Sequence, residues 1–266
     1  MPLTIIQRLD LLRNLGRPVI HDYMPLLFSS FVELHGDRCF GDDMAITGGI
    51  GLFDGKPVTI IAQVRGRDIE ELKKVNFSMP HPEGYRKALR LAKQAEKFRR
   101  PIICFIDTPG AYCGIGAEER GQSEAIARCL YDFMMVQTPV LSVVLGEGGS
   151  GGALALGVCD GLAMLENALF SVISPKGFAS ILWKDASREK EAASLMKITA
   201  EDLYAYGICD AIIAEPEGGA AKDVRMTASN IAAWLRGELG RIEREDCALL
   251  PEKRYAKYRK IGVFAE

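Results

Sequence analysis

Two glycine-rich turns carry the residues of this sequence that are best suited to chemistry. The first is the segment 107–116, DTPGAYCGIG, and the second is 146–152, GEGGSGG; each follows a short apolar run. Glycine loses more conformational freedom on folding than other residues, so a high density of glycines needs a reason. One reason is a backbone that approaches a ligand closely. Successive N–H groups at the start of a helix can donate to one oxygen and stabilise its negative charge. The turns therefore predict an oxyanion-binding site made of backbone, with tight strand–helix packing as the alternative for any single glycine pair.

The second turn also contains a serine in the pattern GxSxG, from Gly148 to Gly152. That pattern is typical of the nucleophile elbow of α/β hydrolases, in which the serine precedes an acid and then a histidine. The three histidines of this chain stand at positions 21, 35 and 81, all upstream of Ser150. A hydrolase of that fold would lack its base here. A different fold could still bring His81 to Ser150, so Ser150 stays the weaker candidate.

Charged residues near the turns are also candidates. Asp107 ends an apolar run and could orient a ligand or cap its own loop. Arg86, Lys87 and Arg90 form a basic face on one expected helix. A solvated face is the simpler interpretation of these three, and contact with an anionic ligand is the alternative. The run Glu-Glu-Arg at 118–120 fits the first turn of a helix, where acidic side chains favour the helix dipole and a solvated ion-pair cluster is expected.

The spacing of apolar residues predicts the elements that position these turns. Short apolar runs predict buried strands, apolar residues at helical spacing predict helices, and Asp54-Gly55 predicts a hairpin. Strands are expected at 45–52, 57–64, 101–106, 139–145, 162–165, 169–173 and 209–213, and helices near the N-terminus and at 22–34, 84–98, 116–136, 151–158, 186–196, 200–206, 222–244 and 253–260. This alternation predicts one α/β domain with a mainly parallel sheet, in which ligands gather where strands end.

The composition argues against several classes of protein. Of the 266 residues, 48% are hydrophobic and 26% charged, as in a globular domain with a sizeable core, and a formal net charge of −2 argues against a nucleic-acid surface. No run approaches the roughly 20 apolar residues of a membrane span, and the amphipathic start of the chain does not resemble a signal peptide. The seven cysteines form no CxxC pair. We therefore expect no metal site and reduced core thiols in a cytoplasmic protein.

Four long motifs give the chain a resemblance to a known family. They are NFSMPHPEGYRKAL at 76–89, DTPGAYCGIGAEERGQ at 107–122, GEGGSGGA at 146–153 and SVISPKGFASILWK at 171–184. Through them the chain resembles the alpha subunits of the carboxyltransferase component of bacterial acetyl-CoA carboxylase. The likeness runs from about Asp22 to Gly219, and the length and order of the motifs make it specific.

The resemblance implies a fold and a reaction. The fold would be α/β and crotonase-like, a single domain of repeated β-β-α units with N-terminal helices at 1–35, a core at 36–219 and C-terminal helices at 220–266. The reaction would transfer a carboxyl group from carboxybiotin to acetyl-CoA and form malonyl-CoA, the first committed step of fatty acid synthesis. The alternatives are a carboxyltransferase or decarboxylase for another acyl-CoA, and a non-catalytic scaffold subunit. Dense glycine turns argue against a scaffold.

The resemblance also implies partners. Biotin would be carried by a separate biotin carboxyl carrier protein. A carboxyltransferase beta subunit would carry a zinc ribbon and most of the acyl-CoA pocket, so that no metal is expected in this chain. Two copies of each subunit would form an α2β2 heterotetramer with the active site between the two kinds of chain.

The same resemblance implies a set of site residues. The family is thought to use two oxyanion holes, one on the beta subunit for the enolate of the acetyl thioester and one on the alpha subunit for the ureido oxygen of biotin. The second hole falls on the N–H groups of Gly151 and Gly152. Biotin itself would act as the base, so no protein nucleophile is needed. The surrounding loop that would contact substrate or biotin comprises Gly110, Ala111, Gly148, Gly149, Ser150 and Ala153.

Four positions depart from the usual family pattern. Cys113 stands where the family usually has proline and Ser78 where it usually has glycine, and Lys176 and Phe178 replace what are commonly glutamate and cysteine. None of them lies in the second turn. The implied reaction class is unchanged, and the departures affect only the expected shape of the first loop.

Overall fold

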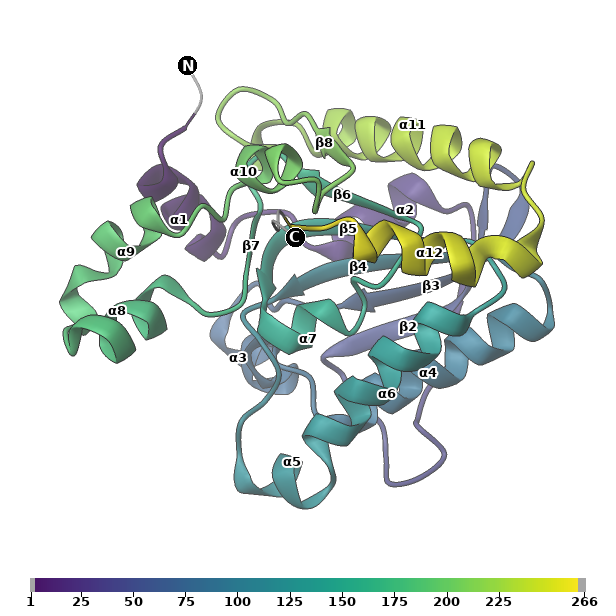
Figure 1. The fold of residues 1–266 in the computed structure, drawn as a ribbon, viewed down its shortest axis with the longest axis horizontal. Helices are drawn as coiled ribbons and strands as arrows, with labels where there is room; N and C mark the ends of the chain where they lie inside the picture. Colours follow the sequence, from purple (N-terminus) through teal and green to yellow (C-terminus); the bar gives the residue numbers. More distant parts are fainter. Residues whose placement is uncertain (1–2, 263–266) are drawn as a thin grey trace, which may run out of the picture.

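The computed structural model describes residues 3–262, which form a central sheet between two layers of helices (Figure 1). The strands are β1 (Phe31–Glu33), β2 (Ile46–Phe53), β3 (Lys56–Gln63), β4 (Ile102–Thr108), β5 (Val140–Gly149), β6 (Gly161–Leu165), β7 (Leu169–Ser171) and β8 (Ala211–Ile213). Their order across the sheet is β1-β2-β3-β4-β5-β6-β8, and β7 pairs with the end of β5. The β1–β2 and β2–β3 pairs are antiparallel and the later pairs are parallel. The mainly parallel sheet expected from the sequence is confirmed.

Helices cover both faces of this sheet. They are α1 (Ile5–Arg13), α2 (Ile20–Leu27), α3 (Ile69–Lys74), α4 (Pro82–Lys97), α5 (Ile115–Glu119), α6 (Gln122–Met135), α7 (Ser150–Leu154), α8 (Pro175–Trp183), α9 (Glu189–Leu195), α10 (Ala200–Ala205), α11 (Val224–Ile242) and α12 (Leu250–Arg259). On β2, a Cβ on Gly48 would lie 2.5 Å from Leu91 of α4. Phe53 points to the opposite face, where its ring lies 6.1 Å from that of Phe28, at the end of α2. Thus α4 with α6, and α2 with α11, form opposite layers (Figure 1).

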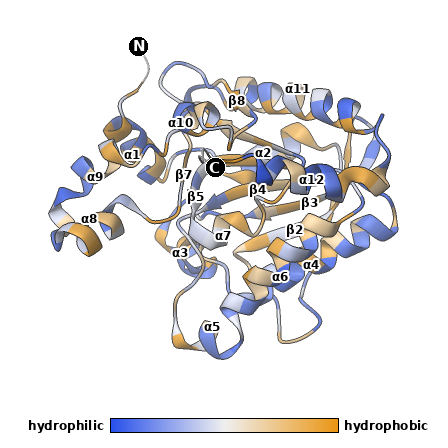
Figure 2. Ribbon diagram, in the orientation of Figure 1, coloured by the Kyte–Doolittle hydropathy of each residue, from blue (hydrophilic) through white to orange (hydrophobic). Residues whose placement is uncertain are grey.

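The central strands read as continuous apolar runs because both faces of the sheet are covered. Every residue of β4 and β6 is buried. Figure 2 shows hydrophobic colour along these strands, whereas α4 and α11 carry both hydrophobic and hydrophilic residues. The buried core joins the strands to both helix layers. The position of the strand ends is therefore set by this core.

The expected helix at 22–34 is wrong in its second half. α2 begins at Ile20 and ends at Leu27, and Phe31–Glu33 is the edge strand β1, paired with β2. Ser29 and Ser30 separate the two, and backbone hydrogen bonds join each of them to Leu52 in β2. This segment gains more from pairing with an open sheet edge than from continuing a helix, because β-branched and aromatic residues fit a strand. The expected description of 1–35 as helices is corrected accordingly.

Two further boundaries differ from expectation next to the glycine turns. The helix expected at 116–136 is broken at Gly121, whose φ of +82° ends α5 and precedes α6. The strand expected at 139–145 continues to Gly149, so most of the second glycine turn is the end of β5. α7 then begins at Ser150. Gly146, Gly148 and Gly149 thus belong to a strand, where their small size lets side chains or, at Gly149, the Pro109 backbone approach closely.

The arm formed by α8 and α9 was expected only in part: α9 lies within the helix expected at 186–196, whereas α8 was not expected. α8 follows β7, and with α9 it projects beyond the strand ends, on the left in Figure 1. The start of α8 has a sequence signal typical of a helix, because the Ser174 side chain accepts from the Gly177 N–H and Pro175 occupies the first turn. α1 packs against α9 through a small apolar cluster that includes Leu9, Leu12 and Ala193. The division into 1–35, 36–219 and 220–266 stays a prediction.

Candidate active site

The two glycine-rich turns lie side by side where the parallel strands β4 and β5 end. A Cβ added to Gly149 would come within 2.1 Å of the Pro109 carbonyl oxygen, and one on Gly152 within 2.5 Å of the Ala111 nitrogen. Real side chains do not approach backbone so closely, so the second turn packs directly on the first. The structure therefore brings together the two segments that the sequence singled out.

Gly151 has no such packing reason to be glycine. A Cβ there would have Cγ2 of Ile126 as its nearest neighbour, at 3.5 Å, an ordinary van der Waals contact. A Cβ on Gly148, by contrast, would lie 2.1 Å from the ring of Phe170. No side chain caps the start of α7, where the first N–H groups of a helix lack partners within it. Packing explains Gly148, Gly149 and Gly152, but not Gly151.

Ser150 connects β5 to α7 in the left-handed conformation, with φ of +53°. An exposed serine in this conformation between a strand and a helix has the geometry of a nucleophile elbow. The candidate base from the sequence, His81, is engaged elsewhere: its ring lies 4.2 Å from that of Tyr112 and 3.2 Å from a nitrogen of Arg120. Within residues 3–262, no hydrogen bond joins a histidine to Ser150. The arrangement does not support a serine hydrolase.

A buried polar network holds the ends of the strands behind the turns. The Asp107 carboxylate accepts from Arg17 at 2.6 and 2.8 Å and from the Glu147 N–H at 3.1 Å. Gln63, the last residue of β3, accepts from the Asp107 N–H and donates to the Gly152 carbonyl. Burial alone would lower the pKa of Arg17, but Asp107 raises it above its ordinary value, so the guanidinium stays charged. Asp107 therefore serves a buried ion pair.

Gln63, Arg17 and Tyr85 were not expected from the sequence. Gln63 has a signal, because it is a polar residue in the apolar run 57–64, and buried polar side chains must find partners. The Tyr85 hydroxyl would lie 2.9 Å from a Cβ on Gly152, so this ring fills the space behind the turn. Burial raises the pKa of Tyr85 well above its usual value, which keeps the phenol neutral. Arg17 lies far from the turns in sequence, and no local pattern indicates its role.

The basic face expected on α4 is not solvated. The Lys87 ammonium is buried and donates to the Asp42 carboxylate and the Asp43 carbonyl. Arg86 donates to Asp37 and to the Arg120 carbonyl, and Arg90 donates to the carbonyls of residues 35 and 36. These side chains hold the loop 35–43 against α4. We therefore do not retain Arg86, Lys87 and Arg90 as contacts for an anionic ligand.

The expected solvated ion-pair cluster at 118–120 is also wrong. Glu118 and Glu119 are exposed, but Arg120 reaches back to the buried carboxylate of Glu83 at the start of α4. Its guanidinium also lies 4.5 Å over the ring of Phe40. Arg120 thus ties the break between α5 and α6 to the first turn of α4.

A strained segment supports the first glycine turn. Asn76, Phe77 and Ser78 have φ values of +50°, +55° and +63°, the left-handed region that favours glycine. The Ser78 carbonyl accepts from the Thr108 hydroxyl at 2.5 Å, which joins this segment to the end of β4. A glycine at position 78, which the resemblance implies is usual, would adopt this conformation without strain. Ser78 is buried, and its hydroxyl has no hydrogen-bond partner among residues 3–262.

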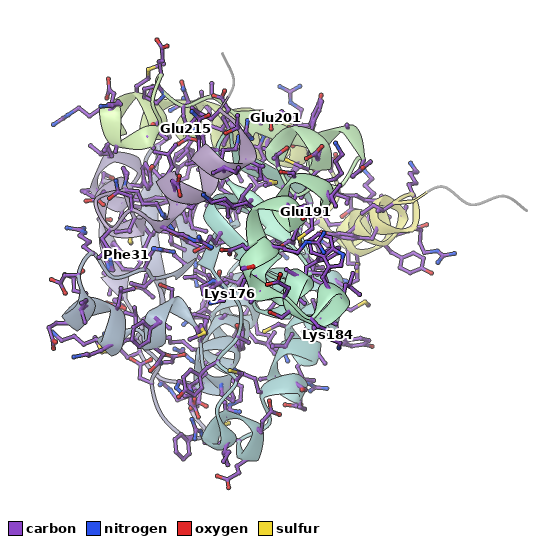
Figure 3. The ribbon with its side chains drawn as sticks, turned by 90° about the vertical axis from the view of Figure 1, so that its left-hand side faces the viewer. Phe31, Lys176, Lys184, Glu191, Glu201 and Glu215 are labelled. Carbon is purple, nitrogen blue, oxygen red and sulfur yellow. The ribbon has the colours of Figure 1, made fainter. Side chains whose placement is uncertain are left out.

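The other departures lie on exposed segments. Cys113 is exposed in the first loop. Figure 3 shows Lys176 and Lys184 at the two ends of α8, and both are exposed. The Phe178 ring packs edge-on against Trp183, with centroids 5.5 Å apart. Phe178 therefore packs within α8.

The cavity that borders the turns is small. It has a volume of ≈ 50 Å³ and is lined by residues of both turns, including Pro109 and Gly149, and by the start of α8. A larger cavity of ≈ 590 Å³ contains no turn residue, and Arg65 links it to Glu147 through a 2.7 Å ion pair. Pockets for small ligands usually have about 300–1,000 Å³. The cavity beside the turns is well below this range.

The described part of the chain contains no group of three or more His, Cys, Asp or Glu residues arranged to hold a metal ion. Cys104, Cys129, Cys159 and Cys209 are buried free thiols, as expected for core cysteines. Over residues 3–262, no helix has the length and apolar character needed to cross a membrane.

Comparisons with known proteins agree over almost the whole sequence. A family model described as "Acetyl co-enzyme A carboxylase carboxyltransferase-like" matches residues 1–262. The acetyl-coenzyme A carboxylase carboxyl transferase subunit alpha of Clostridium acetobutylicum is 56% identical over 99% of this chain and 96% of that protein. The subunits beta/alpha protein of Clostridium tetani is 55% identical over 97% of this chain and 45% of its own length.

Solved structures share the fold at low sequence identity. Transcarboxylase 12S has a TM-score of 0.68 at 19% identity and covers 88% of this chain and 44% of its own. The beta subunit of geranyl-CoA carboxylase from P. aeruginosa has a TM-score of 0.64 at 15% identity and covers 100% of this chain and 48% of its own. The crotonase-like fold expected from the sequence is confirmed.

Proposed function

Because this chain belongs to the acetyl-CoA carboxylase carboxyltransferase family, as an alpha subunit, we propose that its second glycine-rich turn stabilises negative charge during carboxyl transfer. The chain is a subunit of the enzyme that carboxylates acetyl-CoA to malonyl-CoA. The relatives support this reaction over transfer to, or decarboxylation of, another acyl-CoA. The contribution proposed for this chain is a set of backbone N–H donors.

The N–H groups of Gly151 and Gly152 are the proposed donors. Carboxybiotin, delivered on a separate carrier protein, supplies the carboxyl group. Gly151 and Gly152 would donate to the ureido oxygen of biotin as charge grows there, since donors fixed in advance stabilise developing charge best. The observation that carries this proposal is Gly151, the glycine of the turn that no packing contact explains. Its missing side chain leaves the uncapped start of α7 open to a ligand.

The surrounding loop has mainly a shaping role in this proposal. Gly148 and Gly149 admit Phe170 and the Pro109 carbonyl, and so place the start of α7 against the first turn. The remaining residues of the proposed loop belong to these turns or come directly after them: Gly110, Ala111, Ser150 and Ala153. A bound group would meet backbone there. No nucleophile is required of Ser150.

A beta subunit is the expected partner of an alpha subunit, and the fused relative from Clostridium tetani supports this pairing. We propose that it completes the site in an α2β2 heterotetramer and carries the zinc ribbon. The ≈ 50 Å³ cavity beside the turns supports a shared site, because it is too small for a substrate. Val172, next to that cavity, is 83% exposed, and Ile181, on α8, is 59% exposed. Apolar side chains as exposed as these suit a surface that a partner covers. The free thiols also fit a cytoplasmic location.

Purification with the beta subunit tests the proposal. The complex should form malonyl-CoA from acetyl-CoA in an assay that depends on the carboxylated carrier protein, and this chain alone should not. Propionyl-CoA in place of acetyl-CoA measures acyl preference. Robust malonyl-CoA formation by the isolated chain would contradict a site shared by two subunits.

A further inference from the structure

Gln63 joins the two glycine turns through its side-chain amide. It is the last residue of β3 and is fully buried. Its Oε1 accepts from the Asp107 N–H at 3.1 Å, where the first turn begins. Its Nε2 donates to the Gly152 carbonyl at 2.8 Å, inside α7. One side chain thus bonds to backbone on both sides of the candidate oxyanion hole.

The hydrogen bond from Gln63 to the Gly152 carbonyl supports α7, a helix too short to be stable by itself. α7 has five residues, and helices of this length are not stable without tertiary contacts. The carbonyls of Gly151 and Ala153 accept from backbone N–H groups at residues 155 and 156, whereas the Gly152 carbonyl accepts from Gln63. Without Gln63 that buried carbonyl would lack this donor, a loss that costs about 1–3 kcal/mol if left uncompensated. The first turn of α7 would then relax towards a new partner.

We propose that Gln63 is a positioning residue for carboxyl transfer: it holds the Gly152 carbonyl, in the peptide that follows Gly152, and so fixes the first turn of α7 that presents the Gly151 and Gly152 N–H groups. This inference rests on the proposed function of the second turn. Gln63 does not touch substrate and acts through Gly152. An amide suits the position because it donates and accepts at once, which neither an ionised carboxylate nor an apolar side chain can do. A displacement of about 1 Å at a catalytic group can reduce turnover about 100-fold.

The first test compares Gln63→Met with a matched control, both in complex with the beta subunit. Methionine keeps the length of the side chain and removes both hydrogen bonds. The control is Ser142→Ala, because the buried Ser142 hydroxyl donates at 2.6 Å to the Leu156 carbonyl, just beyond the far end of α7. Gln63→Met should lower kcat by about 10- to 100-fold with little change in KM. Ser142→Ala should lower the melting temperature by an amount comparable to that of Gln63→Met and leave kcat unchanged.

The second test uses pH as a readout that a merely structural role would not change. In Gln63→Glu, burial raises the pKa of the new carboxyl. The Arg17–Asp107 ion pair lies on the Asp107 side of position 63, and the Tyr85 hydroxyl lies on the Gly152 side. Protonated, it can accept from the Asp107 N–H and donate to the Gly152 carbonyl as the amide does; ionised, it cannot donate. The kcat of Gln63→Glu relative to the unchanged enzyme should therefore rise several-fold as pH falls through that pKa.

The outcomes separate this inference from the proposed function. Loss of kcat in Gln63→Met, retention in Ser142→Ala and recovery of Gln63→Glu at low pH support it. Equal losses of kcat in Gln63→Met and Ser142→Ala, or a pH-independent Gln63→Glu ratio, overturn it. If Gly151→Ala loses turnover while Gln63→Met keeps it, the inference fails and the proposed site stands. If neither loses turnover, the proposed site fails as well.

Discussion

Gly152 packs so closely against Ala111 that a Cβ on Gly152 would lie 2.5 Å from the Ala111 nitrogen. Gly151, one position earlier, has ordinary space around it. The adjacent glycines of the second turn are therefore glycine for different reasons. This difference allows packing and catalysis to be tested separately.

Gly151→Ala should fold normally and lose activity. The new methyl group meets only Ile126 at 3.5 Å, but it would occupy the space at the start of α7 that a bound group needs. We expect turnover to fall by about 100-fold through displacement of that group. Gly237→Ala is the control, since Gly237 lies in α11 with nothing within 4 Å of its Cβ position. Full activity in folded, assembled Gly151→Ala would return the turn to a packing role.

Gly152→Ala should damage folding as well. Its methyl group would press on the backbone of Gly110 and Ala111 and on the Tyr85 hydroxyl. Such overpacking costs about 1–3 kcal/mol. Chemical denaturation should report a lower free energy of unfolding for Gly152→Ala than for Gly151→Ala. The same contacts make proline at Gly152 unsuitable as a test of the N–H group.

Ser150→Ala should keep most of the activity of the complex. The residue has the φ of a nucleophile elbow, but no histidine bonds to it in the described chain. Removal of a true nucleophile lowers kcat by several orders of magnitude. Steady-state assay of the variant and labelling with a fluorophosphonate probe both address this. Labelling at Ser150 together with near-total loss of turnover would favour the hydrolase interpretation.

Ser78→Gly should stabilise the protein. The substitution removes a Cβ from a residue with φ of +63° and a buried hydroxyl without a protein partner among residues 3–262. Relief of the left-handed conformation, less the flexibility that glycine adds to the unfolded chain, leaves a gain of about 0.5–1 kcal/mol. Ser78→Ala is the control, because it removes the hydroxyl and keeps the Cβ. If Ser78→Gly unfolds at a lower denaturant midpoint than Ser78→Ala, backbone strain is not the dominant effect at this position.

Asp42→Asn should destabilise the protein, and the difference should vanish in acid. Partial burial by itself would raise the pKa of Asp42, but the hydrogen bonds from Lys87 and the Gly36 N–H lower it from 3.8 to about 2. A lowered pKa means stability that is present above pH 4 and is lost as pH falls through about 2.

We expect Asp42→Asn to cost about 1–3 kcal/mol at pH 7, because the buried Lys87 loses its carboxylate. The difference in free energy of unfolding between Asp42→Asn and the unchanged protein should disappear between pH 4 and pH 2. Lys87→Met and the double variant complete a cycle of denaturation measurements. A gap that is independent of pH, or additive losses in the double variant, would contradict the ion pair as its source.

The sequence was sufficient to predict most of the parallel sheet and both glycine turns. Short apolar runs mark strands buried on both faces, and glycine runs after them mark places where backbone meets backbone or a ligand. These signals are local, which is why β4 and the hairpin at Asp54 and Gly55 could be predicted. Edges were harder: Phe31–Glu33 is a strand only because β2 offers an open edge.

Only the tertiary structure decided which residues support the turns. Arg17 meets Asp107 across 90 positions of sequence, and Gln63 meets Gly152 across 89. Such pairs depend on the order of strands in the sheet, and no local periodicity encodes that order. The same holds for Lys87, whose helical pattern suggested a solvated face until the loop 35–43 covered it. Local sequence marked the glycine turns, and long-range packing determined that Gly152 meets other backbone closely whereas Gly151 does not.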